Sequence, residues 1–530
     1  MGRGPAPVWA PPPPRVADSL LTRFAAAAIA HGYSGEGAGR RASDYEPLWR
    51  WSVEHRAEFW KAVWDFGGVR ASHAESSVLT AAGAMPGARW FKGARLNYAE
   101  NLLRHGGEEL ALVSLNERGR RRTWTRDALR ADVAALAAAL KTEGVKPGDR
   151  VAGLLPNGAE SLIAFLASAS LGAVWASCAA ELDEAALLAR LPPLEPKVLF
   201  ACDGYRRDGK LVDVRAMVAR VHAALPGLKR LVVVPSLHEV PDLAALPDAK
   251  LFPDYRVAGA AAEFAPLPFE HPLCILHAEL NGALEGVVHG AGGVLLQHLQ
   301  ELMLHADLKP GDALLLAARC GERPWYRAIS ALATGAHLVL HDGALFHPGP
   351  EALWDLADHE QLTHLGVDVE YLVELKNTGL KPAARWKLPK LRTLLCAGMP
   401  SPDLSDYIHR DIKPDLQLAA SWSGNGLAAC FALGNPWLPV YRGELQGRGL
   451  GMAVDVFDED ERPLRDQPGA LVCTKAFPAM PLGFWKDEDG RRYRAACFGR
   501  FTGVWHQGDR ATLTARGTLT IAARSDAPLA

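Results

Sequence analysis

Short apolar runs alternate with amphipathic stretches along the middle of the chain. In the stretch 126–144, Leu129, Val133, Leu136 and Leu140 share one helical face, and Gly144 ends the pattern. Between such helices, apolar runs of about five to seven residues are typical of strands buried on both faces of a parallel sheet. The predicted strands are LALVSL (110–115), RVAGLLP (150–156), AVWASC (173–178), PKVLFACDG (196–204), KRLVVVPS (229–236), LCIL (273–276), DALLLAA (312–318), AHLVLHDG (336–343) and LRTLLCAG (391–398).

This alternation predicts an α/β fold with two doubly wound, mostly parallel sheet subdomains, at 110–266 and 267–434. Residues 1–109 are predicted to form a helical and irregular cap, whose tryptophans pack on the larger body. The segment 435–530 is rich in Gly and Pro, and its short alternating runs predict a smaller antiparallel β subdomain.

One strand–helix junction, LHAELNGALEGVVHGAGG (276–293), has an unusual composition. The pattern predicts a strand that ends at Leu276, a solvated loop, and a helix that begins near Gly292. Phosphates commonly bind at such junctions. This one has no Ser, Thr, Lys or Arg, and carries Glu279 and Glu285 instead. We expect both carboxylates to lie in a solvated loop and to satisfy the positive end of the helix.

Composition narrows the function classes. The formal net charge is −2, so there is no basic surplus for nonspecific binding of nucleic acid or an anionic membrane. The eight cysteines are scattered without a C-x-x-C pair, which argues against a zinc site and against a disulfide scaffold, and we expect no metal site. Free thiols fit a reducing cytoplasm. No apolar run is long enough to predict a membrane span.

Several long stretches resemble the adenylate-forming acyl-CoA synthetase family, and within it the acetoacetyl-CoA synthetases. The most specific are MPGARWFKGARLNYAENLL (85–103), GNPWLPVYRGELQGRGLGMAVDVFDED (434–460) and FPAMPLGFWKDEDGRRYRAACF (477–498). The resemblance covers nearly the whole chain and implies the large N-terminal domain of that fold. It also implies a reaction in which ATP with Mg²⁺ activates acetoacetate as an adenylate, and coenzyme A then displaces AMP. Such catalysis depends on positioning and charge neutralisation.

In the family, a Ser/Thr/Gly-rich loop closed by Gly, Pro and Lys holds the β- and γ-phosphates. The matching positions here are His277 to Gly286, between intact flanks. Glu279 and Glu285 would stand beside a polyanion, at a repulsion of roughly 3–4 kcal/mol each. We therefore expect that ATP does not bind in the usual way.

Other family positions are partly kept. By resemblance, Gly398 and Pro400 form a turn against adenine, while Ser423 and Gly424 remain from a Ser-Gly-Gly-Thr-Asp motif. The motif's Thr and its acid, which helps to hold Mg²⁺, are absent, and Leu427 offers no oxygen ligand.

The family's ribose contact corresponds to Asp509, with Arg524 beside it. These two residues and the four kept positions are the residual nucleotide contacts that we expect. Asp509 has an equally simple interpretation as a turn residue. By resemblance, two further segments line the pocket for the acid substrate. There the residue types differ from those of the family, at Glu322, Arg323, Arg327, Asp368 and Glu370. The sequence stops at the family's hinge, so the mobile C-terminal domain and its catalytic Lys are expected to be missing.

Three hypotheses follow. The chain is an acetoacetyl-CoA synthetase homologue that no longer adenylates and acts as a scaffold, as a partner of an active paralogue, or as a binder of a small acyl, AMP or CoA-like ligand. It is alternatively an active acid–CoA ligase completed by another chain that carries the missing domain. The third hypothesis is a decayed product without a selected function. No catalytic residue is assigned, and turnover in an ATP–pyrophosphate exchange assay would favour the second hypothesis.

Overall fold

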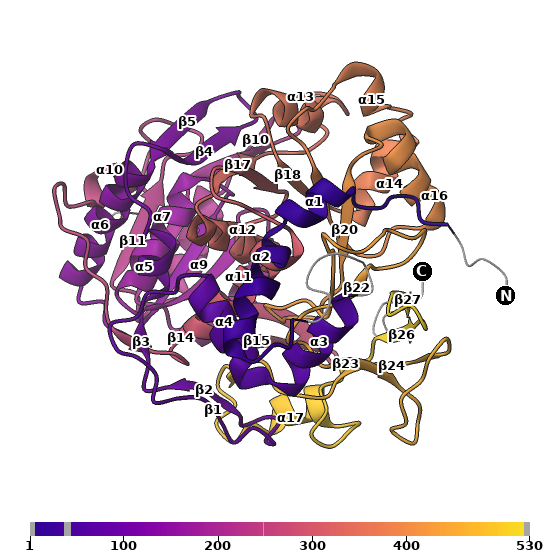
Figure 1. Ribbon diagram of the computed structural model, residues 1–530. Coiled ribbons are helices and arrows are strands. Elements are labelled where there is room, and N and C mark those ends of the chain that lie inside the picture. Colours follow the sequence, from indigo (N-terminus) through magenta and orange to yellow (C-terminus); the bar gives the residue numbers. More distant parts are fainter. Residues whose placement is uncertain (1–5, 36–43, 247, 524–530) are drawn as a thin grey trace.

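The computed structural model describes residues 6–35, 44–246 and 248–523, which form two large sheets and several smaller ones (Figure 1). The first large sheet is parallel from its β12 edge as far as β14, and β15 and β25 extend it in the antiparallel sense. In spatial order its strands are β12 (Lys250–Leu251), β11 (Arg230–Val234), β8 (Val198–Cys202), β6 (Arg150–Leu155), β7 (Val174–Ala179), β14 (Pro272–Leu280), β15 (Ala283–Gly290) and β25 (Gly483–Phe484).

The second large sheet has seven strands, all parallel except one edge strand. In spatial order they are β20 (Gln417–Ser421), β19 (Thr393–Ala397), β18 (His364–Asp368), β16 (Ala313–Leu316), β17 (His337–Asp342), β4 (Leu110–Asn116) and the antiparallel β5 (Arg121–Thr125). The prediction of two mostly parallel sheets is confirmed.

Helices cover these sheets, and two of them are buried almost throughout. Every residue of α11 (Ala291–Leu299) is buried, and α7 (Ala159–Ser170) has a single partly exposed residue, Glu160. The predicted helix from 126 is α6 (Arg126–Thr142), and the hydroxyl of Thr125 caps it by accepting a hydrogen bond from the backbone N–H of Ala128. Other helices are α8 (Glu184–Arg190), α9 (Arg215–Ala223), α12 (Arg323–Ser330), α13 (Ala352–His359), α14 (Val369–Asn377), α16 (Pro402–Tyr407) and α17 (Arg491–Phe498).

The N-terminal part packs as the sequence predicts. It contains α1 (Pro13–Asp18), α2 (Leu20–Ala27), α3 (Tyr45–Glu54) and α4 (Arg56–Phe66). Trp49, Trp51, Trp60 and Trp64 are all buried, and Trp64 stacks on Phe91 with ring centroids 4.6 Å apart. These tryptophans therefore belong to the main hydrophobic core.

The Gly- and Pro-rich C-terminal part contains a four-stranded antiparallel sheet. Its strands are β23 (Val454–Phe457), β24 (Pro468–Cys473), β26 (Arg510–Leu513) and β27 (Leu519–Ala523). The smaller antiparallel sheet predicted for this region is thus confirmed, and it lies toward one end of the molecule (Figure 1).

The two large sheets take their strands from interleaved parts of the chain. β4 and β5 belong to the sheet that contains β16 to β20, whereas β14 and β15 belong to the sheet that contains β6 to β8. The boundaries at 109/110, 266/267 and 434/435 stay a prediction about folding units and do not divide the sheets.

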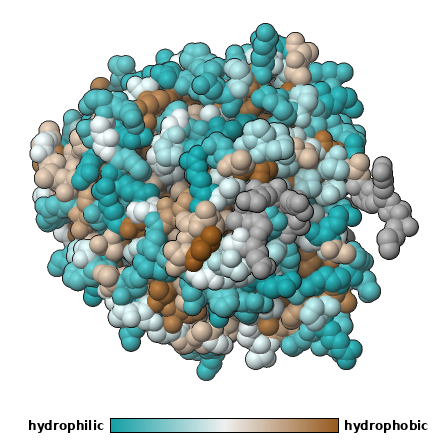
Figure 2. Space-filling model, in the orientation of Figure 1, coloured by the Kyte–Doolittle hydropathy of each residue, from teal (hydrophilic) through white to brown (hydrophobic). Residues whose placement is uncertain are grey.

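The face in Figure 2 is largely hydrophilic, with apolar residues in scattered positions. Within the described ranges, no helix combines the length and the apolar composition needed to cross a membrane.

Candidate nucleotide-binding site

The junction expected to be a loop is a tight β-hairpin. β14 continues to Leu280, and β15 returns from Ala283, so only Asn281 and Gly282 form the turn. Their φ angles are 50° and 74°, the left-handed values that a type I′ turn requires. The predicted loop after Leu276 is therefore wrong. The Asn-Gly pair between apolar runs is the signal that could have predicted this hairpin.

Glu285 is not a solvated loop residue. It is only 5% exposed and forms an ion pair with Arg492, in the first turn of α17. Burial without a partner would be costly for a carboxylate, so this pair stabilises the hairpin against α17. Glu279, by contrast, is exposed as expected.

The positive end of α11 is satisfied by backbone carbonyls rather than by the two glutamates. The backbone N–H of Ala291 donates to the carbonyl of His271 over 2.8 Å, and that of Gly292 donates to Phe269 over 2.9 Å. A Cβ on Gly293 would lie 2.1 Å from the carbonyl oxygen of Pro478. The expected role of Glu279 and Glu285 at this helix end is therefore wrong, because the chain itself covers it.

The loop after β20 contains the kept residues Ser423 and Gly424. The Ser423 hydroxyl lies 2.6 Å from the carbonyl oxygen of Ala429, to which it donates within its own loop. A Cβ on Gly424 would lie 2.1 Å from Oε1 of Gln507. The Leu427 side chain, where the family has polar residues, is fully buried. The Ser423 hydroxyl therefore bonds within the protein, and Leu427 packs in the hydrophobic core.

Three loops meet at this place. The Asn425 side-chain amide donates to the carbonyl of Glu279 over 2.6 Å, and the Gln507 side-chain amide donates to the carbonyl of Asn425 over 3.0 Å. Nε2 of His289 lies 2.8 Å from the carbonyl oxygen of Gly426, to which it donates as the neutral tautomer. The structure thus brings together the hairpin, the Ser423 loop and the Asp509 loop. Their contacts to one another occupy the space between them.

Asp509 is enclosed. It is 3% exposed, and the indole Nε1 of Trp422 donates to its Oδ2 over 3.1 Å. The backbone carbonyl of Asp509 accepts a hydrogen bond from Leu471. Arg524 lies outside the described residues.

The Gly-x-Pro turn is formed. Gly398 has a φ of 104°, and its N–H donates to the carbonyl of Ser421 over 3.0 Å. Pro400 follows as a buried residue. This turn therefore lies beside the end of β20, two residues before Ser423.

Sequence reasoning missed Arg492, Trp422 and Gln507, which contact candidate residues from distant segments. Four of the residues that differ from the family in the predicted substrate pocket lie together. Arg323, Arg327, Glu322 and Asp368 all line one cavity of about 100 Å³. Among the described residues, no group of three or more His, Cys, Asp or Glu side chains is suited to a metal ion. The Ser423–Leu427 loop does not fit Mg²⁺ with a triphosphate, because it contains no carboxylate and its Leu427 side chain is buried and apolar.

Comparisons with known proteins agree with this architecture. Residues 99–277 match the family model "AMP-binding enzyme", and residues 45–102 match "Acetyl-coenzyme A synthetase N-terminus". The AMP-binding match ends three residues before the last residue of β14 and does not include the hairpin turn.

Individual relatives are similar over nearly the whole chain. An acetoacetyl-coenzyme A synthetase of Rhizobium meliloti is 41% identical over 99% of this chain and 80% of its own length. The Mus musculus acetoacetyl-CoA synthetase is 38% identical over 97% of this chain and 77% of its own length. A solved acetoacetyl-CoA synthetase structure from Streptomyces lividans superimposes with a TM-score of 0.93 at 39% identity, over 98% of this chain and 80% of that one. The chain belongs to the adenylate-forming acyl-CoA synthetase family and is acetoacetyl-CoA synthetase-like.

Proposed function

We propose that this chain is an acetoacetyl-CoA synthetase-like protein that does not adenylate an acid by itself. The observation that carries the proposal is the two-residue Asn281–Gly282 turn, at the position where the family resemblance implies a long phosphate-binding loop. A type I′ turn of two residues has no backbone N–H groups left to surround a phosphate, and this one adds no cation.

Contacts around the hairpin support the proposal. The Glu279 carbonyl, Asn425 and Gln507 bond to one another, so a triphosphate would have to displace these contacts. Exposed Glu279 would repel the phosphates. Leu427, as a buried apolar residue, supplies no metal ligand. Each feature opposes ATP with Mg²⁺ independently of the others.

The remaining nucleotide contacts stay a proposal. Gly398, Pro400, Ser423, Gly424, Asp509 and Arg524 are proposed to support at most weak binding of AMP or a CoA-like ligand. The enclosed carboxylate of Asp509 agrees with weak binding, because a ribose would have to displace the Trp422 indole. The proposed role is therefore non-catalytic: ligand binding, or assembly with an active paralogue.

The test is ATP–pyrophosphate exchange with acetoacetate and Mg²⁺, using the purified chain. The Rhizobium meliloti synthetase, assayed in parallel, provides the positive control. We expect exchange at the level of a control without protein. Exchange that depends on acetoacetate and on this chain would overturn the proposal, and a thermal shift with AMP would then separate nucleotide binding from turnover.

A further inference from the structure

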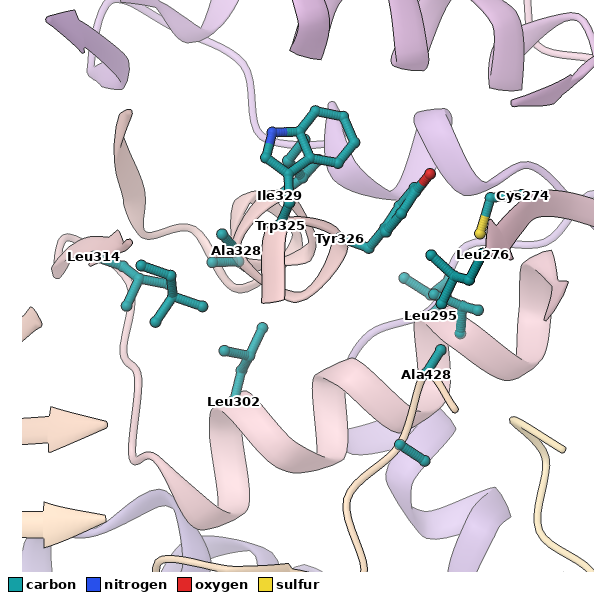
Figure 3. Close-up of a cluster of buried hydrophobic side chains, with 14 of the residues drawn as sticks. Cys274, Leu276, Leu295, Leu302, Leu314, Trp325, Tyr326, Ala328, Ile329 and Ala428 are labelled. Atoms are coloured by element: carbon teal, nitrogen blue, oxygen red, sulfur yellow. The ribbon is translucent and has the colours of Figure 1, made fainter. Parts of the chain in front are cut away.

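The interior around α12 is closely packed. Trp325, Tyr326 and Ile329 are fully or almost fully buried, and Figure 3 shows Tyr326 directed toward Cys274. A groove of about 700 Å³ lies in a different part of the molecule, between α3 and the four-stranded antiparallel sheet. Figure 1 shows α3 beside β23 of that sheet. The volume of this groove is within the range of sites that bind small organic molecules.

The groove is separate from the candidate nucleotide site. Strand β26 begins at Arg510, directly after Asp509, and ends at Leu513, and the turn that follows it lines the groove as far as Gly517. A strand rises about 3.3 Å per residue, so roughly 13 Å of chain separates Asp509 from this turn. No residue of the hairpin, of the Ser423 loop or of the Asp509 loop lines the groove.

One face of α3 forms a wall of the groove. Four residues of this helix, three or four positions apart, share that face and line the groove: Glu46, Trp49, Arg50 and Val53. Trp49 and Val53 are buried, whereas Arg50 is exposed. Val454 of β23 and Leu513 of β26, both buried, line the groove from the sheet. The groove therefore has an apolar floor and a charged rim.

Three of the five cations that line the groove have carboxylate partners. The guanidinium groups form ion pairs at 2.9, 2.6 and 2.6 Å: Arg448 with Glu46, Arg465 with Asp455, and Arg516 with Glu444. The Arg448 guanidinium also stacks on the Trp49 ring, with its central carbon 3.3 Å from the ring centroid. These three cations are therefore neutralised within the walls of the groove.

Lys475 is the exception at one end of the groove. It is partly buried, and its ammonium group donates to the carbonyl of Val53 over 3.1 Å. No carboxylate in the described ranges forms an ion pair with it. An ammonium group has three donors, so two remain for other acceptors. Arg50, one turn before Val53, has only Glu46, 3.9 Å away, which Arg448 already neutralises. Together with exposed Glu54, these two cations leave one net positive charge.

We propose that this groove binds an organic monoanion with an apolar body. The oxyanion is held by the Lys475 ammonium group, Arg50 adds positive charge, and the body lies on the apolar floor between α3 and β26. The net charge favours one negative group, and the carboxylates of the rim disfavour a second. The inference goes beyond the proposed function and does not rest on it, because the groove and the candidate nucleotide site share no residue.

The test is isothermal titration calorimetry of the full chain with 1-naphthoate, and with 1-naphthamide as the uncharged probe that has the same rings. We expect naphthoate to bind and naphthamide to bind much more weakly. Lys475→Gln keeps a donor for the Val53 carbonyl but removes the charge, and it should weaken naphthoate binding roughly ten-fold. Lys475→Arg keeps the charge and should bind naphthoate nearly as the parent does. Lys390→Gln, on an exposed lysine that does not line the groove, is the matched control and should leave binding unchanged.

A second variant keeps the test decisive if Lys475→Gln does not fold. Arg50→Gln changes an exposed side chain, and it should weaken naphthoate binding by up to about five-fold, the usual range for an exposed charge pair. A role of Lys475 limited to the end of α3 would leave naphthoate binding equal in the parent and in Lys475→Gln. That result, equal binding of the two probes, or no binding of naphthoate to the parent would overturn the inference. The titrations contain no ATP, so their outcome is separate from that of the exchange assay.

Discussion

The Glu285 carboxylate and the Arg492 guanidinium form an ion pair between segments 207 residues apart, joining the hairpin to the start of α17. Glu285 is buried and Arg492 is half-exposed. Because of this difference in burial, the two partners should respond differently to substitution.

Removal of the Arg492 cation alone should destabilise the folded protein more than removal of both charges of the Glu285–Arg492 pair. We expect Arg492→Gln to lower the free energy of unfolding by about 1–3 kcal/mol, because it leaves a buried carboxylate without its counter-ion. Arg492→Gln combined with Glu285→Gln should cost less than Arg492→Gln alone. Urea unfolding monitored by tryptophan fluorescence measures both. Arg491→Gln, on an exposed neighbour, is the control, and a double variant that is less stable than the single one would contradict this account.

The hairpin turn should be sensitive to a single methyl group. Gly282→Ala forces an L-residue to a φ of 74°, although nothing lies within 4 Å of the added Cβ. We expect a loss of about 1 kcal/mol from backbone strain alone. Gly227→Ala, at an exposed glycine with equally open space and no positive φ, should be near neutral. Equal midpoints of thermal unfolding for the two variants would argue against a left-handed turn.

Stability should fall on mild acidification. Burial lowers the pKa of both His289 and His305 to about 4, from the ordinary value of 6.5. Between pH 4 and 6.5 the unfolded chain binds more protons at these sites, so stability is full above pH 6.5 and is lost as pH falls toward 4. Each residue contributes up to about 1.4 kcal/mol per pH unit. Thermal midpoints from pH 4.5 to 7.5 check this, and His289→Gln should flatten the slope.

Asp342 should change the pH dependence of stability in the opposite direction to the two histidines. Burial, with Glu181 and Glu117 nearby, raises the pKa of its carboxyl group to about 7 from 3.8. The folded chain therefore binds more protons between these values, and this group reduces stability as pH rises from about 4 to 7. The stability gained by Asp342→Asn should grow across that window and then level off. A gain that is constant from pH 4 to pH 8 would exclude titration as its cause.

A graft of the phosphate loop alone should not restore adenylation. We expect a chain whose Asn281–Gly282 turn is replaced by a Ser/Thr/Gly-rich loop with a Lys to remain at background in ATP–pyrophosphate exchange. Leu427 would still supply no metal ligand, and Asn425 and Gln507 would still bond across the site. Exchange after the graft alone would place the whole defect in the hairpin.

The alternation of apolar runs predicted both sheets, because strands such as β6 and helices such as α6 have periodic patterns that are local. The Glu285–Arg492 pair has no local pattern, since the two residues meet only after folding, so the sequence alone wrongly predicts a solvated Glu285. Ser423 illustrates a further limit. A serine whose hydroxyl donates to a carbonyl of its own loop looks the same in the sequence as a serine whose hydroxyl faces a ligand.

The interleaving of the two large sheets has a consequence for synthesis on the ribosome. β4 leaves the ribosome early but pairs with β17, and β14 pairs back to β7 across a long connection. One edge of β4 therefore stays unpaired until residue 342 has emerged, β7 waits for β14 at 272–280, and β15 waits for β25 at 483–484. Nascent chains arrested before these points should depend on chaperones that cover exposed strand edges.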